Sequence, residues 1–546
     1  MEKPDHEPAS SINPKNGFCS ETKIFHSLRP QVSLPPPIFP LSITDYAFSL
    51  LRTHPPPPAA CALVDAITGR SIRFDELEVL VKMLSSSLRT RIGFSKGDSA
   101  LILSPNSLHI PILYFALFSL GIVVSPLNPA STKSEISRQI ELSKPTIAFV
   151  TSDTAHKLPP LRYGTVLLDS PDFESLLEGP IVEMEDVEVR QSDTAAILYS
   201  SGTTGAVKGV ELTQRNWTAA VALGHALSPV RKTPSVILCM VPYFHVYGFV
   251  VCLRALAMGH CVVTKAIGRF NLEEMLGVIE KFKVTHAALA PPIVSAMAPS
   301  ENARKRYDLG SLEVVQCGGA SLSKSVIEKF KQRFPHVQLL QAYGLTETTA
   351  RIFATVGGRE CQVTGATGKL MSNCQAKIVD PDTGIALPPG NPGELWVRGP
   401  IIMKGYVGDE KATAGILDSE GWLRSGDLGY IDDEGFLFFV ERIKELIKYK
   451  GYQVAPAELE FLLHSHPDVI DAAVVPYPDE EAGQIPMAFI VRRLGSTIDE
   501  SQIINFIAKR VAPYKKLRRV TFVNSLPKTI TGKLLRKDLI KLASKL

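Results

Sequence analysis

Short apolar runs alternate with helix-like stretches along much of the chain, and this alternation constrains the fold more than any other feature of the sequence. Residues 99–104, 122–125 and 146–150 are apolar runs of strand length, and residues 133–142 have the spacing of a helix. The same alternation continues in the runs at 262–263, 272–283, 285–289, 312–316 and 324–334. Strands joined by helices need crossover connections, so the pattern predicts an α/β fold with largely parallel sheets.

Length and local composition divide the chain into an arm and two domains. At 546 residues the chain is too long for a single simple core. Residues 1–40 are rich in Pro, Ser and Asn, and they predict an extended, surface-draped arm before a large domain of residues 41–440. Gly and Pro punctuate short strands in the last part of that domain, so an antiparallel β subdomain is predicted over about 378–440.

The last 106 residues, 441–546, predict a small α+β domain that is hinged on its charged first residues. A domain of this size with its own apolar faces can move as a unit relative to the large domain. The elements predicted within it are a helix from Pro456, strands at 470–475 and 487–491, and a helix from Thr497, with Thr497 and Glu500 at the spacing of a capping box.

Bulk composition excludes several classes of protein. Lys and Arg exceed Asp and Glu by four, so no basic field indicates a nucleic-acid partner. The eight cysteines form no CxxC pair, which indicates a reduced compartment and no structural zinc. The most apolar segment, residues 108–127, contains Pro111, Gly121 and Pro126 and is better read as a helix and a strand than as a transmembrane segment.

The chain ends in Ser544-Lys545-Leu546, and its first residues do not have the pattern of a secretory signal. A Ser-Lys-Leu tripeptide at the carboxyl terminus is an address read by the peroxisomal import receptor. The sequence therefore predicts a peroxisomal protein with that receptor as a partner. A chance ending on a polar, basic helix is the alternative.

The candidate phosphate-binding stretch is Ser200 to Gly209, with the sequence Ser-Ser-Gly-Thr-Thr-Gly-Ala-Val-Lys-Gly after an apolar run at 195–199. Glycines let backbone N–H groups approach oxyanions, hydroxyls donate hydrogen bonds, and Lys208 adds a positive charge. The stretch is not a P-loop, because Gly rather than Ser or Thr follows Lys208. It predicts a strand–loop–strand hairpin over a polyphosphate, and an ordinary Gly/Ser/Thr turn is the alternative.

Four further motifs carry candidate chemistry. Residues 341–347, Gln-Ala-Tyr-Gly-Leu-Thr-Glu, offer a ring on which a base can stack, a hydroxyl for a phosphate and a carboxylate for Mg²⁺. Asp427 is predicted to lie in a tight turn where it can accept both ribose hydroxyls, residues 441–451 are basic, and Lys533 follows Gly532 near the C-terminus. Taken singly, these motifs have structural alternatives: a capped turn, a solvated basic face and a flexible loop.

Together and in this order, the motifs resemble those of the acyl-adenylate-forming superfamily, and within it plant 4-coumarate:CoA ligases and their peroxisomal ligase-like relatives. The resemblance extends from about residue 40 to the end and is most specific at residues 393–399 and 444–460. It implies a two-step reaction. A carboxylate attacks the α-phosphate of Mg·ATP to give acyl-AMP and pyrophosphate, and the thiol of coenzyme A then attacks the acyl-AMP after the small domain has rotated.

The resemblance also implies roles for individual residues. Lys533 would neutralise charge at the α-phosphorus, Glu347 would bind Mg²⁺, and Thr346, His245 and Lys448 would complete the catalytic set. The ATP and AMP contacts would be Ser200, Ser201, Gly202, Thr203, Thr204, Lys208, Gly319, Gln341, Tyr343, Thr346, Asp427, Arg442, Lys444, Lys448, Gln453 and Lys533. The coenzyme A contacts would be Arg269, Lys450 and Gly451, and the acyl pocket would contain His245, Tyr247, Gly344, Ala350 and Arg351.

This sequence departs from the 4-coumarate ligase pattern at several positions. Position 441 is Glu where Asp is usual, position 342 is Ala rather than Gly, and residues 206–207 are Ala-Val rather than Leu-Pro. Residues 348–351, Thr-Thr-Ala-Arg, replace small residues, Pro and Val. These differences leave the ATP motifs intact but predict an acyl pocket that is not built for hydroxycinnamates.

The sequence therefore predicts an ATP-dependent carboxylate:CoA ligase whose acid is a fatty, oxylipin-type or aromatic acid. A luciferase-like oxygenase and a non-catalytic binder of acyl adenylates are the alternatives, and the intact Lys208, Glu347, Asp427 and Lys533 argue against the second. For Arg351 two placements remain open. It either forms an ion pair that faces away from the pocket, or it contacts a distal oxygen of the substrate, because an unpaired buried guanidinium is costly.

Overall fold

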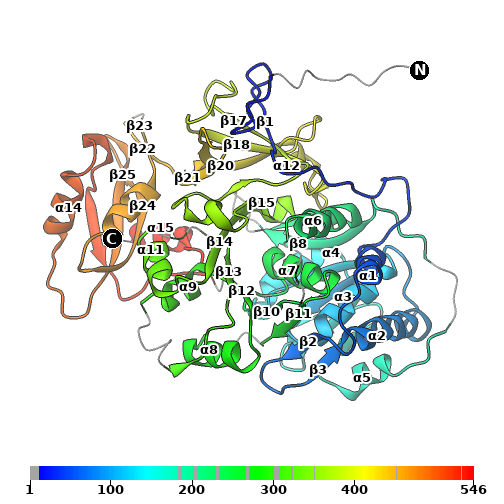
Figure 1. The fold of residues 1–546 in the computed structure, drawn as a ribbon. Coiled ribbons are helices and arrows are strands. Elements are labelled where there is room, and N and C mark those ends of the chain that lie inside the picture. The colour runs from blue at the N-terminus through cyan, green and yellow to red at the C-terminus, as the bar shows by residue number, and fades with distance from the viewer. Residues whose placement is uncertain are drawn as a thin grey trace.

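The structure is a computed structural model of the 546-residue chain. Its fold has three parts in space: a large body of helices and sheets, a β subdomain above it, and a small C-terminal domain at one side (Figure 1). The residues it describes are 11–182, 187–200, 207–228, 231, 233–265, 270–299, 306–320, 322, 324–349, 351–450, 452–529 and 532–545.

The first sheet of the large domain has seven strands, and four of its six pairings are parallel. The antiparallel exceptions are the pairs β9–β8 and β19–β9 at one edge. In spatial order the strands are β19 (Gly405–Tyr406), β9 (Lys208–Thr213), β8 (Thr194–Ser200), β5 (Val123–Pro126), β4 (Ser99–Leu103), β6 (Ile147–Val150) and β7 (Thr165–Leu167). The predicted strands at 99–104, 122–125 and 146–150 are confirmed within one or two residues.

The second sheet has nine strands, of which the six central ones are parallel. In spatial order they are β16 (Lys369–Leu370), β15 (Arg351–Ala354), β14 (Gln338–Gly344), β13 (Val314–Cys317), β12 (His286–Leu289), β10 (Val236–Cys239), β11 (Cys261–Thr264), β2 (Cys61–Asp65) and β3 (Ser71–Arg73). The predicted α/β fold with largely parallel sheets is confirmed.

Helices pack between the two sheets and on their outer faces. Alternate residues of a strand point to opposite faces. On β4, Ala100 and Ile102 therefore join the central core, whereas Leu101 and Leu103 join a separate core on the other face. The helices of the central core are α1 (Ile43–Thr53), α2 (Phe74–Ser87), α3 (His109–Ser119), α6 (Gln214–Ala226) and α7 (Val246–Ala257).

A stack of aromatic rings joins three of these central helices. The ring of Phe249 on α7 lies 4.5 Å from that of Trp217 on α6 and 4.3 Å from that of Tyr114 on α3, measured between centroids. The outer faces are covered by α4 (Lys133–Ser143), α8 (Leu272–Lys281), α9 (Pro291–Met297) and α11 (Lys324–Arg333), while α5 (Pro171–Leu177) packs on α2. The central core thus fixes α7, the helix that borders the cavity described below.

The β subdomain is a five-stranded antiparallel sheet. Its strands are β1 (Phe25–His26), β17 (Gln375–Val379), β18 (Gly393–Arg398), β20 (Leu423–Ile431) and β21 (Leu437–Arg442), with the short helix α12 (Glu410–Ala414) between β19 and β20. Strand β1 comes from the N-terminal segment that the sequence predicts as a draped arm. Phe25, which is 1% exposed, pairs with Ala376, so this segment completes the sheet edge.

The small domain is built on the long hairpin β24 (Val469–Asp479) and β25 (Gly483–Arg492), flanked by β22 (Ile447–Tyr449), β23 (Tyr452–Val454) and β26 (Arg519–Phe522). Its helices are α13 (Pro456–His464), α14 (Glu500–Ala508) and α15 (Arg536–Ala543).

The predicted start of α14 is wrong. The capping box uses Asp499 and Gln502 rather than Thr497 and Glu500, because Glu500 instead accepts a hydrogen bond from the Val520 N–H of β26 at 2.9 Å.

A loop of the small domain packs directly against the large domain. Gly532 has φ +81°, and a Cβ at this position would lie 2.0 Å from Cγ of Pro292 on α9. Only glycine combines this backbone conformation with so close an approach. The contact holds the loop that carries Lys533 at the boundary between the two domains.

Candidate active site

Strands β8 and β9 form the predicted hairpin, in which Ser200 pairs with Lys208. The connecting residues, including the predicted phosphate contacts Ser201, Gly202, Thr203 and Thr204, lie outside the described residues. The Lys208 ammonium lies 4.4 Å from the centre of the Tyr406 ring on the neighbouring strand β19. A cation over an aromatic face is attracted to it, so Tyr406 holds Lys208 at the end of the hairpin.

Glu347 lies beside this hairpin, in the turn Thr346–Thr348 that follows β14. One of its carboxylate oxygens, Oε1, accepts hydrogen bonds from Ser200 Oγ and from the Tyr406 hydroxyl, both at 2.9 Å. Burial and the neighbouring carboxylate raise the pKa of Tyr406, so its hydroxyl stays a donor. The other oxygen, Oε2, accepts no hydrogen bond from any residue that the structure describes.

This arrangement fits a magnesium ion that arrives with a nucleotide. Mg²⁺ is usually held by one or two carboxylates together with substrate phosphates and water rather than by a cage of protein ligands. Among the described residues there is no cluster of three or more His, Cys, Asp or Glu side chains that could hold a metal. Glu347 is therefore a single-carboxylate site next to the predicted phosphate-binding hairpin.

Asp427 lies on β20 directly across from Arg442 on β21. The carboxylate is almost fully buried, accepts a hydrogen bond from the Tyr343 hydroxyl at 2.7 Å, and lies 3.1 Å from Nε of Arg442. Burial raises its pKa, while Arg442 and Tyr343 oppose the rise. Oδ1 makes no hydrogen bond of acceptable geometry within the described part of the chain. It is therefore a buried acceptor suited to the hydroxyls of a ribose.

The other predicted nucleotide contacts lie on the two strands beside Asp427. Gly319 follows β13 and has φ +89°, and a Cβ at this position would have no atom within 4 Å, so a ligand can approach its backbone closely. Gln341 on β14 donates from Nε2 to the Ala366 carbonyl at 3.2 Å, which ties its side chain to the protein. Thr346 immediately precedes Glu347 in the turn after β14.

Lys533 of the small domain faces these large-domain groups. Burial and the Arg442 charge lower its pKa, while Glu445, Asp427 and Glu347 oppose this effect. The loop is closed by a hydrogen bond from the Lys533 N–H to Thr529 Oγ1 at 3.0 Å and by another from the Thr529 N–H to the Lys533 carbonyl at 2.8 Å. Lys533 thus joins Asp427, Arg442 and Glu347 in one charged group.

The structure does not bring Lys448 and Lys450 to this group. Lys448 and Lys450 lie at the exposed β22–β23 turn. Their contacts are within the small domain: the Lys448 N–H donates to Gln484 Oε1 at 2.8 Å, and Lys450 pairs with Glu481. Gly451 and Arg269 lie outside the described residues, and for Gln453 only the backbone in β23 is described.

Lys444 is at the boundary between the two domains, in the turn Ile443–Glu445 that follows β21. Partial burial, together with Arg442 and Lys533, lowers its pKa to about 8. The pKa of Lys533 is lowered for related reasons. Arg442, Lys444 and Lys533 are therefore three cations that share one part of the domain boundary.

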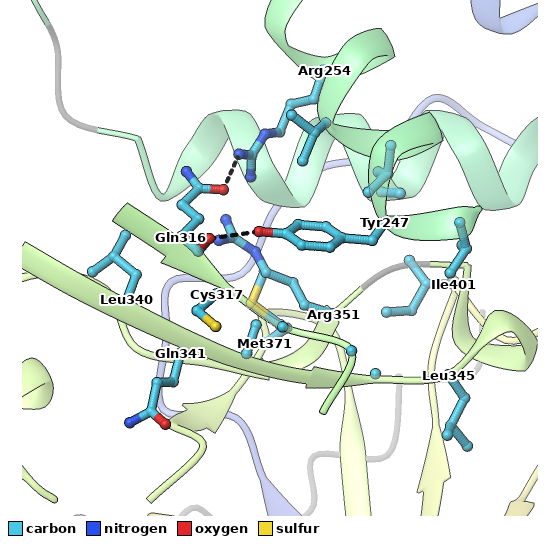
Figure 2. A pocket seen from close by; sticks show the side chains of 18 of the residues that line it. Tyr247, Arg254, Gln316, Cys317, Leu340, Gln341, Leu345, Arg351, Met371 and Ile401 are labelled. Atoms are coloured by element: carbon cyan, nitrogen blue, oxygen red, sulfur yellow. Dashed lines mark hydrogen bonds between the residues drawn. The ribbon is translucent and has the colours of Figure 1, made fainter. Parts of the chain in front are cut away.

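A cavity next to the charged group runs between α7 and the strands β13, β14 and β15 (Figure 2). It offers about 80 Å³ to the centres of water-sized atoms, which is room for several waters or part of a ligand. Of the predicted acyl-pocket residues, His245, Tyr247, Gly344 and Arg351 line it, and Ala350 lies outside the described residues. Gly344 directly follows Tyr343, so the cavity and the Asp427 site meet at the end of β14.

His245 caps the N-terminus of α7 and accepts a hydrogen bond from the Tyr247 N–H at Nδ1, at 3.2 Å. Burial and the Lys533 charge lower its pKa to about 4, so the ring is neutral near pH 7. Its remaining nitrogen, Nε2, then carries the proton. His245 is thus a neutral hydrogen-bond donor at the cavity rather than a core histidine without a role.

The structure places Arg351 in the cavity wall, not on the surface. Its side chain makes no hydrogen bond or ion pair with any described residue, so the predicted alternative of an outward-facing ion pair is wrong. Sequence reasoning missed a second arginine, Arg254 on α7, which also lines the cavity and donates to Gln316 Oε1 at 3.3 Å. A single arginine within the apolar helix of residues 246–257 is the signal that could have identified it.

Sequence reasoning also missed Tyr406 and Gln316. Tyr406 reaches Glu347 because β19 pairs with β9, across almost 200 residues of chain. Gln316 accepts a hydrogen bond from the Tyr247 hydroxyl through its backbone carbonyl at 2.8 Å. No local motif marks either residue, since both act through long-range strand neighbours.

Comparison with known families gives two matches. A family model described as AMP-binding enzyme matches residues 52–407, and a second, described as AMP-binding enzyme C-terminal domain, matches residues 458–533. The boundary between the two matches lies near the hinge region, and together they include most of the residues that the structure describes.

Two similar proteins come from Arabidopsis thaliana. The protein 4-coumarate--CoA ligase-like 9 is 51% identical over 547 residues, which cover 97% of this chain and 97% of that protein. Peroxisomal OPC-8:0-CoA ligase 1 is 44% identical over 549 residues, which cover 98% of this chain and 99% of that protein. Similarity at this level extends over whole chains and not over one motif.

Two solved structures share the fold. ATP-bound MatB from Rhodopseudomonas palustris has a TM-score of 0.81 at 25% identity, covering 92% of this chain and 99% of that chain. The o-succinylbenzoate CoA synthetase MenE from Bacillus subtilis, in complex with the acyl-adenylate intermediate OSB-AMP, has a TM-score of 0.78 at 26% identity, covering 90% of this chain and 97% of that chain.

Proposed function

This chain belongs to the AMP-binding enzyme family and is an acid–thiol ligase, and we propose that the residues around Asp427 and Lys533 carry out its reaction in two steps. In the first, a carboxylic acid and ATP give acyl-AMP and pyrophosphate. In the second, the thiol of coenzyme A displaces AMP to give the acyl-CoA thioester. No helix in the described part of the chain has the length and apolar character needed to cross a membrane.

One observation carries the assignment of roles. Tyr343 contacts Asp427 and the next residue, Gly344, lines the cavity, while Lys533 is within electrostatic reach of both Asp427 and His245. A nucleotide held at Asp427 and an acid held in the cavity therefore meet beside Lys533. That geometry is what an attack of a carboxylate on an α-phosphate requires.

In the first step the residues of the large domain hold the nucleotide. Asp427 accepts the ribose hydroxyls, Tyr343 and Gly319 border the adenine, and Ser200, Thr346 and Lys208 contact the phosphates with the loop that follows Ser200. Glu347 would hold Mg²⁺, which would supply positive charge for the phosphate oxygens. His245 donates from Nε2 to the acid and fixes the orientation of its carboxylate, and Lys533 stabilises the charge that develops at the α-phosphorus.

In the second step the small domain presents a different face. Lys448 and Lys450 lie in the hairpin segment of β22 and β23 and contact only small-domain residues, so a rotation about Lys444 would exchange Lys533 for Lys448, Lys450, Gly451 and Gln453 at the site. Arg269 and Lys450 supply positive charge for the phosphates of coenzyme A. The exposed position of the hairpin supports this exchange, since Lys448 and Lys450 have contacts only within the small domain.

The experiment separates the two half-reactions. Lys533→Ala is expected to slow pyrophosphate release from ATP and acid by about 10²- to 10³-fold, since a positioned cation acts only in the step where charge develops. The same variant should still convert supplied acyl-AMP and coenzyme A to thioester. Lys509→Ala, an exposed lysine at the end of α14, is the control. An equal loss in both half-reactions would refute the role of Lys533.

We also propose that the acid is a fatty or oxylipin-type acid and that the enzyme acts in peroxisomes. A 44% identical relative is named a peroxisomal OPC-8:0-CoA ligase, and the chain ends in Ser544-Lys545-Leu546. Ser544 and Lys545 extend the last turn of α15 and are exposed, so a receptor can reach them. Deletion of these three residues should leave a fluorescent fusion in the cytosol with ligase activity retained. Import that persists after the deletion would contradict this assignment.

A further inference from the structure

The cavity wall carries two positive charges without a negative one. Arg254 from α7 and Arg351 from β15 both line it, and none of the described lining residues is acidic. In Figure 2 the side chains of Arg254 and Arg351 lie one above the other on the same side of Gln316. Burial, together with the Arg254 charge, lowers the pKa of Arg351 to about 9, so Arg351 is still charged near pH 7, and an arginine such as Arg254 keeps its proton in proteins. Two like charges at one buried place are unfavourable unless something binds between or beside them.

Most of the donor groups of these arginines are unused. A guanidinium has five N–H donors, and the described residues accept only one hydrogen bond from the pair, from Arg254 Nη2 to Gln316 Oε1 at 3.3 Å. Both side chains keep some accessible surface, and because they line the cavity this surface faces the cavity interior. The remaining donors are therefore available to a molecule inside the cavity.

The surrounding residues hold the two arginines in place. Gln316 accepts from Arg254 through its side chain and from the Tyr247 hydroxyl through its backbone carbonyl. Arg254 also packs against Gly224 on α6, where a Cβ would lie 2.5 Å from Cδ of Arg254. The Arg254 side chain thus occupies the space that a side chain at position 224 would fill. The pair belongs to an ordered wall, not to a flexible surface.

The position of Arg254 on α7 sets the length of a matching ligand. Arg254 follows His245 by nine positions along the helix, which corresponds to about 13 Å at the α-helical rise. An extended chain covers roughly 1.2 Å per bond, as the peptide backbone does, so about eleven bonds separate the two ends. The acid end lies at His245 and Gly344, and the far end lies at the arginines.

We propose that Arg254 and Arg351 together bind a second oxygen-bearing group, a carboxylate or a ketone carbonyl, at the far end of a medium-chain acid substrate. This inference rests on the proposed ligase function and specifies its substrate class. A carboxylate would accept hydrogen bonds from the unused N–H groups and would also balance the positive charge of the pair. A ketone would only accept the hydrogen bonds. The acid with a distal carboxylate is therefore the better substrate of the two, and an acid with neither is the poorest.

The test uses three acids of equal length: decanoic, 9-oxodecanoic and decanedioic acid. The measured quantity is kcat/KM for pyrophosphate release in the wild-type enzyme. Loss of a charged hydrogen bond to a substrate typically costs about 10- to 150-fold in specificity, so decanedioic acid should exceed decanoic acid by at least about 10-fold, with 9-oxodecanoic acid between them. Hexanedioic and hexanoic acid, which are too short to reach Arg254, should differ less.

The variants are Arg254→Met and Arg351→Met, which keep much of the side-chain volume and remove the charge. In each variant, the ratio of kcat/KM for decanedioic acid to kcat/KM for decanoic acid should fall towards one. Arg351→Lys, which keeps a positive charge, should retain part of the wild-type preference. Arg306→Met is the control, because Arg306 pairs with Glu273 on the surface outside the cavity. A thermal denaturation curve for each variant separates loss of fold from loss of specificity.

The outcomes are distinct. Wild-type enzyme that activates decanoic acid but shows no preference for a distal oxygen overturns the inference and leaves the ligase function standing. A preference that survives both Met variants also overturns it. Absence of pyrophosphate release with every acid, with and without coenzyme A, overturns the proposed function itself. A preference that both Met variants abolish supports the inference.

Discussion

Two buried arginines in this molecule have opposite surroundings. Arg536 on α15 has a 13% exposed side chain and contacts three carboxylates. Its guanidinium donates to Glu445 at 2.7 Å and to Glu460 at 2.5 and 3.0 Å, and it lies 3.6 Å from Glu441. Arg351 in the acyl cavity contacts no carboxylate among the described residues, and its strongest charged neighbour is another arginine.

The surroundings displace the two pKa values in opposite directions. Burial alone would lower the pKa of Arg536, but Glu460 and Glu441 outweigh it and raise the value. For Arg351, burial and Arg254 act together and lower it. A charge that the protein neutralises itself serves the fold, whereas a charge that it leaves unbalanced requires a partner from outside. The comparison therefore distinguishes a structural arginine from one that contacts a ligand.

The largest expected effect in this comparison is at Arg536. Arg536→Met would remove the cation that Glu441, Glu445 and Glu460 share, and breaking a buried charge network of this kind costs about 3–5 kcal/mol of unfolding free energy. Chemical denaturation should show this loss. Lys541→Met, an exposed lysine on the same helix, is the control and should stay within about 0.5 kcal/mol of wild type. Equal unfolding free energies for the two variants would contradict the structural role of Arg536.

A smaller effect concerns the pH dependence of stability. Burial raises the pKa of Glu441 to about 7, above its ordinary value of 4.5. Between about pH 5 and 7 the folded state keeps a proton that the unfolded state has lost, so this group stabilises the fold at the lower pH and the stabilisation disappears as pH rises through 7. In Glu441→Gln, the change in unfolding free energy between pH 5 and 7 should be smaller than in wild type by about 1–3 kcal/mol. Parallel stability curves for variant and wild type between pH 5 and 7 would contradict the assignment.

The third effect has the opposite sign. Arg351→Met removes a buried charge without a protein partner, so the ligand-free enzyme should gain about 1–2 kcal/mol of unfolding free energy, or at least lose none. Thermal denaturation without substrate measures this change. Decanedioic acid should raise the melting temperature of wild type and not of the variant. If Arg351→Met destabilises the enzyme as strongly as Arg536→Met, Arg351 is structural after all.

The smallest effect tests the support of Arg254. Gly224→Ala places a Cβ 2.5 Å from Cδ of Arg254 and must displace that side chain, which should reduce the preference for the distal carboxylate by about 3- to 10-fold. Gly277→Ala on α8 is the matched control, because its Cβ would make only an ordinary 3.7 Å contact with Tyr307. That control should leave the preference intact and raise stability by up to about 1 kcal/mol through helix propensity. Equal preferences in the two variants would show that Arg254 is not held by Gly224.

The sequence predicts the nucleotide site better than the acyl cavity. Ser200 and Lys208 lie on one hairpin, and Asp427 and Arg442 pair on adjacent strands, so local patterns and short strand connections bring them together. The parallel sheets are equally predictable, because each strand-like run such as 99–104 has a strong apolar signal. These features depend on neighbours in the chain and need no knowledge of distant contacts.

The remaining features depend on contacts that no local pattern encodes. Arg254 and Arg351 come from a helix and a strand almost 100 residues apart, and only the tertiary fold brings both to one cavity. Strand β1 has two residues, too few for a periodic signal, and forms because Phe25 is buried against a distant sheet. The start of α14 is ambiguous in the sequence because two capping patterns overlap at residues 497–502, and the bond from Val520 to Glu500 decides between them.

The three cations at the domain boundary have a consequence for the order of events in a catalytic cycle. Arg442, Lys444 and Lys533 repel one another, and burial together with this repulsion lowers the pKa values of the two lysines. A bound triphosphate screens them, so we expect the closed arrangement to be most stable when ATP is present. Departure of pyrophosphate removes most of that screening and leaves the cations facing one another. We therefore expect the release of pyrophosphate to favour separation of the two domains before coenzyme A reacts.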